Sequence, residues 1–63
     1  MCLSSVYEMS GGDKNLVCEY VSNIQTLDGE VIMTDIVGAE TKIRGEVTSI
    51  DLVKNIIIVE AKD

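Results

Sequence analysis

Cys2 is the residue with the most informative chemistry in this sequence. If Met1 is removed, Cys2 carries an α-amine and a thiol on adjacent carbons, which together close a five-membered chelate ring. If Met1 stays, its amine, the amide nitrogen of Cys2 and the Cys2 thiolate form the chelate instead. Nitrogen and sulfur donors of this kind suit metals that accept square-planar geometry, chiefly Ni(II) and Cu(II). Because one chain offers too few donors, two N-termini that meet at a dimer twofold would complete the site.

Both cysteines also have a plain structural interpretation. Free cysteines commonly act as small apolar residues, and Cys2 at the start of an edge strand fits that role as well. Cys18 lies between Val17 and Glu19 in a strand-like segment, so we expect it to be a buried thiol of the core. A disulfide between the two cysteines is not expected in a cytoplasmic chain. The candidate metal ligand is therefore Cys2, in its thiolate form.

The other polar side chains offer little for catalysis. The chain has no histidine, which removes imidazole bases and the nucleophile pairs that depend on them. Its carboxylates are scattered along the sequence, so no pair of neighbouring carboxyl groups is indicated for acid–base chemistry. Gly11 and Gly12 precede no helix and no Lys-Ser/Thr pair, so they do not form a phosphate-binding loop. We therefore expect a protein that is not an enzyme.

The net charge of −6, from eleven acidic and five basic residues, narrows the class of partner. A cationic stripe that would neutralise phosphates is missing, which disfavours nucleic acid and anionic membrane surfaces as partners. The two aromatic residues, Tyr7 and Tyr20, are too few to stack single-stranded bases and are expected at the edge of the core. The sequence shows neither a membrane-spanning apolar stretch nor a signal peptide, so the cytoplasm is the expected compartment.

The chain consists mainly of β-forming residues separated by turns, and its 63 residues are expected to form one domain, residues 1–63. Asp28-Gly29 is a strong hairpin signal, because both residues tolerate positive φ. Gly45 interrupts an alternating pattern and predicts a bulge or a sharp bend. Strands are expected at residues 2–9, 16–27, 30–37, 41–50 and 56–61, and the second is either bent or divided in two.

Short strands with frequent turns predict a small barrel, because a chain of this length cannot form two full sheets. The expected fold class is all-β, an SH3-like or Sm-like barrel of five to six short antiparallel strands. A shift in apolar parity between Val47 and Ile50 predicts a bulge or a short 3₁₀ turn before the last strand. That strand is apolar on both faces at residues 56–59, which one short chain covers with difficulty, so we expect a homodimer.

Five segments resemble the CooT family, small accessory proteins linked to nickel insertion into carbon monoxide dehydrogenase. They are MCLSSVY at 1–7, LVCEYV at 16–21, TDIVG at 34–38, IRGEV at 43–47 and IDLVKNIIIVE at 50–60. The specific part of the pattern is the Met-Cys start combined with the glycine and Ile-Asp-Leu block. The resemblance implies a small β-barrel, a homodimer, and nickel bound through Cys2. Members of this family are also widely labelled as RNA-binding proteins.

The leading hypothesis is a metallochaperone-like protein. It would hold Ni(II) as cargo between the Cys2 residues of two copies and pass it to a nickel enzyme such as carbon monoxide dehydrogenase. Two alternatives stay open. A barrel-type RNA-binding module would need the five cations to converge on one face: Lys14, Lys42, Arg44, Lys54 and Lys62. A protein-interaction adaptor would dock a partner through an exposed isoleucine-rich edge and would bind no metal.

Overall fold

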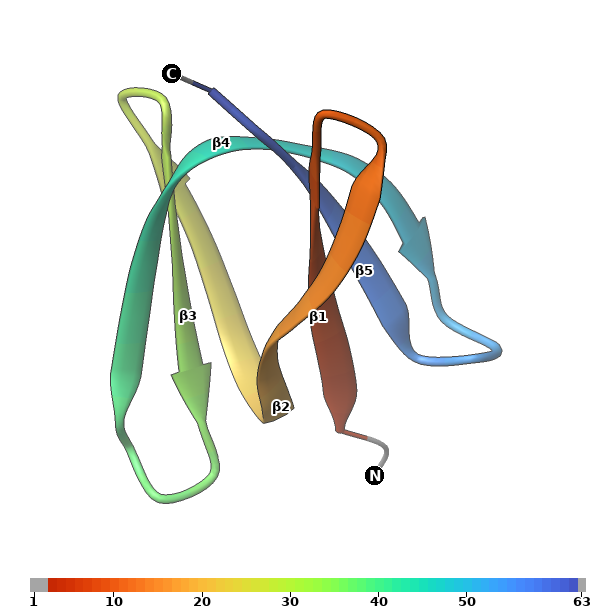
Figure 1. Ribbon diagram of the computed structural model, residues 1–63. Helices are drawn as coiled ribbons and strands as arrows, with labels where there is room; N and C mark the ends of the chain where they lie inside the picture. Colours follow the sequence, from red (N-terminus) through yellow and green to blue (C-terminus); the bar gives the residue numbers. More distant parts are fainter. Residues whose placement is uncertain (1–2, 63) are drawn as a thin grey trace.

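The alternation of β-branched and turn-forming residues gives five β-strands in the computed structural model, which describes residues 3–62 (Figure 1). The strands are β1 (Ser4–Ser10), β2 (Asp13–Leu27), β3 (Glu30–Asp35), β4 (Glu40–Asp51) and β5 (Ile56–Ala61). Residues 3–62 contain no helix, and so none that could cross a membrane. The predicted all-β class is confirmed, with five strands.

The five strands close into a barrel in the order β1-β2-β3-β4-β5. Four neighbouring pairs are antiparallel, and the pair that closes the ring, β1 with β5, is parallel. The closing pair departs from the expected antiparallel arrangement for a geometric reason. When strands alternate in direction around a ring, an odd number of strands leaves one pair pointing the same way.

Two long strands bend, so that each takes part in both halves of the barrel. The first half of β2 pairs with β1 and the second half with β3, and the bend lies at Tyr20, whose φ is 58°. β4 pairs with β3 up to Arg44 and with β5 from Gly45 onward. A Cβ atom at Gly45 would overlap the backbone oxygen of Glu60, so only glycine fits this close approach. The predicted bends in both strands are confirmed.

The ladder between β4 and β5 contains the irregularity that the sequence predicts. Its register shifts between Val47 and Ser49, so Thr48 has no Cα partner in the ladder. An extra residue in one strand exchanges the two faces beyond it, which explains the change in apolar parity. Val47 and Ile50 therefore pair with two core residues of β5, Val59 and Ile57. Val47 packs against the core, whereas Ile50, near the end of β4, is exposed.

The core lies inside the barrel and consists of buried apolar side chains. They are Val6, Val21, Val31, Met33, Ile57 and Val59. On the other face of the last strand, Ile56 and Ile58 are half-buried. The single chain thus covers much of both faces of β5, and the most exposed apolar side chains lie in the bends and turns instead.

The start of β1, the bend of β2 and the β3–β4 and β4–β5 turns lie toward one end of the barrel (Figure 1). Val21, next to the bend, pairs with Ser4 on one side and with Asp35 on the other. The backbone N–H of Ser5 donates a 2.9 Å hydrogen bond to the carbonyl oxygen of Asn55, which links the β4–β5 turn to β1. We call this the N-terminal end; the β1–β2 and β2–β3 turns lie at the opposite end.

Candidate functional site

The predicted metal ligand Cys2 lies outside the residues that the structure describes, as does Met1. Leu3 is the first residue that the structure describes, and β1 begins at Ser4. Ser4 lines a shallow hollow of about 120 Å³ together with the segment after the β2 bend and Ile57. The residues that line this hollow carry hydroxyl, amide and apolar side chains. The candidate site is therefore built from the elements of the N-terminal end that surround the start of β1.

The β3–β4 turn is held by the carboxylate of Asp35. Its Oδ1 accepts hydrogen bonds from the backbone N–H groups of Val37 and Ala39, each 3.0 Å long. Gly38, whose φ is 88°, donates its N–H to the carbonyl oxygen of Asp35 at 3.0 Å. A turn held by a side chain competes with the strand ladder and ends β3 at Asp35. The prediction that this strand continues to residue 37 was therefore wrong.

The same turn is tied to the bend of β2. The N–H of Ile36 donates to the carbonyl oxygen of Tyr20 at 3.1 Å, and the Ser22 hydroxyl donates to the carbonyl oxygen of Thr34 at 3.2 Å. With these bonds, every backbone N–H from residue 35 to residue 39 has a hydrogen-bond acceptor. The backbone of the turn is fixed, while the Val37 side chain is 83% exposed.

The β4–β5 turn repeats this design around Asp51. Its Oδ1 accepts hydrogen bonds from the N–H groups of Val53, at 3.0 Å, and Lys54, at 2.9 Å. Asn55 closes the turn at a φ of 58°, a left-handed conformation that asparagine tolerates better than most residues. Leu52 and Val53 project into solvent, and Val53 is 92% exposed.

Two apolar surfaces therefore lie near the start of β1. The β3–β4 surface comprises Tyr20, Ile36 and Val37, with the flanking acids Glu19, Asp35 and Glu40. The β4–β5 surface comprises Leu52 and Val53, with Asp51 and Lys54. Sequence reasoning missed both surfaces and assigned Tyr20 to the edge of the core. That assignment was wrong: the side chain is 61% exposed, because it lies at the corner where β2 passes between the two halves of the barrel.

Cys18 is the cysteine that the structure describes. It is half-buried and packs against the core, and its Sγ lies 3.8 Å from the carbonyl oxygen of Glu19. The expectation of a fully buried thiol was therefore only partly right. Among residues 3–62, no three cysteine, aspartate or glutamate side chains are grouped so that they could hold a metal ion.

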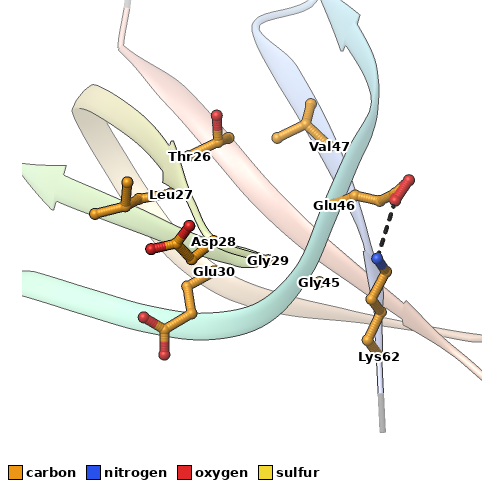
Figure 2. A pocket seen from close by; sticks show the side chains of 9 residues that line it. All are labelled: Thr26, Leu27, Asp28, Gly29, Glu30, Gly45, Glu46, Val47 and Lys62. Carbon is orange, nitrogen blue, oxygen red and sulfur yellow. Dashed lines mark ion pairs between the residues drawn. The ribbon is translucent and has the colours of Figure 1, made fainter.

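A larger hollow, of about 390 Å³, lies at the opposite end of the barrel (Figure 2). It is open and is bordered by the β2–β3 turn, the bend of β4 and Lys62. The Nζ of Lys62 lies 3.3 Å from the Glu46 carboxylate, and Figure 2 shows this pair at one side of the hollow. Asp28 and Glu30 add carboxylates on the other side. The hollow is thus lined by both charged and apolar side chains, and the sequence alone indicated no chemistry for it.

Three of the five cations are engaged locally. Lys62 pairs with Glu46, and Lys42 lies 4.0 Å from Glu30. The Nζ of Lys14 lies 4.7 Å from the centroid of the Tyr7 ring. Each of these three cations thus has a neighbouring side chain as its partner.

Comparison with solved structures first defines the class of fold. A crystal structure of a CooT candidate from Carboxydothermus hydrogenoformans superposes with a TM-score of 0.87, over 98% of this chain and 100% of that chain. At 22% sequence identity, this likeness establishes a shared small barrel fold. None of the curated proteins matches the chain.

The family follows from the sequence itself. The family model for the CO dehydrogenase accessory protein CooT matches residues 1–60, so the chain belongs to the CooT family. The resemblance found in the sequence is thereby confirmed. CooT is a family of accessory proteins rather than catalytic enzymes, which agrees with the expectation that this chain is not an enzyme.

Proposed function

We propose that this chain carries nickel as an accessory protein of carbon monoxide dehydrogenase. Two copies hold one Ni(II) through their Cys2 residues and pass it to the enzyme. Membership of the CooT family supports the link to this enzyme, and the single observation that carries the metal is the nitrogen and sulfur donor set at Cys2. The proposal treats residues 1–63 as one domain that acts in the cytoplasm.

The proposal needs a dimer, and the β4–β5 surface supports one. Leu52 and Val53 are exposed beside an acid and a base, Asp51 and Lys54. A twofold interface brings the same patch of both copies together, so a patch with both signs of charge can pair acid with base. The hydrogen bond between Ser5 and Asn55 ties this turn to the strand that follows Cys2. Association through this surface would bring two N-termini near one another.

A site built from two chain ends suits delivery better than catalysis. Its ligands are a thiolate and nitrogen donors that protons can occupy, so metal binding releases protons and weakens as the pH falls. The divalent affinity order places Cu(II) above Ni(II), so Cu(II) should displace Ni(II) in vitro. Selectivity for nickel in the cell then depends on which ion is available.

The test is a titration of metal-free protein with Ni(II), followed by calorimetry and by native mass spectrometry, for the wild-type protein and for Cys2→Ser. We expect saturation at one nickel per two chains in the wild-type protein and loss of this binding in the variant. Cys18→Ser is the matched control, because it removes the other thiol and should leave nickel binding unchanged. Equal nickel binding by the wild-type protein and Cys2→Ser would refute the proposal.

A further inference from the structure

The β3–β4 surface gathers three large exposed apolar side chains at one corner of the barrel. Tyr20 and Ile36 come from segments far apart in sequence, and the 3.1 Å hydrogen bond between their backbones holds the two segments together. Val37 follows directly and is the most exposed of the three. Single exposed apolar residues are normal on a protein surface, but a contiguous group that includes an aromatic ring marks a site of interaction.

The backbone beneath this surface is already in a fixed conformation. Asp35 Oδ1 holds Val37 and Ala39, and all five N–H groups of residues 35–39 are hydrogen-bonded. Binding therefore orders little additional backbone, which removes one of the main costs of association. A turn of this kind presents Ile36 and Val37 as a preformed apolar knob.

The charge around the knob has one sign. Glu19 precedes Tyr20, and Asp35 and Glu40 flank the two exposed apolar residues of the turn. The two segments that carry these side chains, residues 15–23 and 33–41, include no lysine or arginine. Two copies of the same surface would bring like charges together, and an anionic membrane or a nucleic acid would meet the same repulsion. Charge complementarity thus favours a partner with a basic rim.

We infer that the β3–β4 surface docks the nickel enzyme, in an apolar recess of that protein bordered by lysine or arginine side chains. This inference rests on the proposed function in one respect, namely that the partner is the enzyme that receives the metal. Docking itself uses Tyr20, Ile36 and Val37 and requires no metal. The accessory protein thereby has two separate surfaces, one for its second copy and one for its client.

The test measures binding of the full-length protein to purified nickel-free carbon monoxide dehydrogenase, at low and high salt. Val37→Ser removes the tip of the knob and should weaken binding about tenfold, which is what losing one well-buried apolar side chain amounts to. Leu27→Ser, which removes an exposed apolar side chain at the end of β2 and at the opposite end of the barrel, is the control and should leave binding to the enzyme unchanged. Glu40→Gln should weaken binding a few-fold at low salt and have no effect at high salt. Val37 and Leu27 are both exposed, so the variants should fold as the wild-type protein does.

Nickel titrations of the same variants separate the two proposals. If the wild-type protein binds nickel but not the enzyme, the docking inference is wrong and the nickel proposal stands. If docking depends on Val37 while nickel binding fails, the docking inference stands alone. Dissociation of the dimer in Val37→Ser would show that a second copy covers this surface and would overturn the inference. Binding of wild-type protein, but not Val37→Ser, to lipid vesicles would overturn it as well.

Discussion

The β3–β4 and β4–β5 turns share one local design and differ in their surroundings. Each begins with an aspartate whose Oδ1 accepts two backbone N–H groups, and each holds two large apolar side chains in solvent. The β3–β4 turn is joined to the bend of β2 and is flanked only by acids. The β4–β5 turn is joined to β1 and carries Lys54 beside Asp51.

This difference shows how one structural device can serve two partners. The aspartate fixes the backbone, so each turn presents its apolar pair without a large entropic cost. The neighbouring charges then decide what each surface can approach. A surface with both signs of charge can face its own copy, whereas a surface with one sign needs a partner of the opposite sign.

Gly45→Ala tests the frame that carries both turns and should have the largest effect. β4 connects the two turns and bends at Gly45, where a Cβ atom would overlap the backbone oxygen of Glu60. Relieving that overlap must shift the backbone, at a cost of about 3 kcal/mol in the free energy of unfolding. Urea unfolding measures this loss. Ser49→Ala, on the same strand, should change stability by less than about 0.5 kcal/mol. An unchanged midpoint for Gly45→Ala would contradict the close approach.

The fold could be predicted well from the sequence, because turn residues and apolar alternation are local signals. Asp28-Gly29 marks its hairpin, and residues 56–61 form the last strand as expected. The parallel pairing of β1 with β5 could not be predicted from local signals, because it depends on whether the number of strands in the closed barrel is odd or even. The single chain leaves Ile56 and Ile58 on the outer face of β5 half-buried, so the homodimer expected from this strand stays a prediction.

The two apolar surfaces were harder to foresee, because their residues look like strand residues. Asp35-Ile36-Val37 and Asp51-Leu52-Val53 share a pattern of one aspartate followed by two apolar residues. Apolar, β-branched pairs favour strands, and the prediction placed Ile36 and Val37 in one. The aspartate side chain reverses this preference by binding N–H groups that a ladder would use. The repeated pattern was the signal that could have identified both turns.

Asp35→Ala and Asp51→Ala compare the two turns directly. Each substitution leaves two backbone N–H groups without their charged acceptor, so each should reduce the free energy of unfolding by about 1–2 kcal/mol. Amide hydrogen exchange should accelerate at residues 37–39 in the first variant and at residues 53–54 in the second. Asp→Asn at each position is the control, because the amide oxygen can still accept these bonds. If asparagine fails to restore protection, the carboxylate acts through charge rather than hydrogen bonding.

Lys54→Glu leaves the β4–β5 surface, like the β3–β4 surface, with acids as its only charged residues and should have the smallest effect. Two copies would then face each other with acids only, which should weaken the proposed dimer about fivefold at low salt, an effect that salt screens. Analytical ultracentrifugation at two salt concentrations measures the dissociation constant, and Lys54→Gln separates loss of the cation from gain of an acid. The free energy of unfolding should change by less than about 0.5 kcal/mol, because Lys54 is exposed.

A dimer that resists Lys54→Glu but dissociates in Val37→Ser would reverse the roles assigned to the two turns. Charge would then not be what distinguishes them.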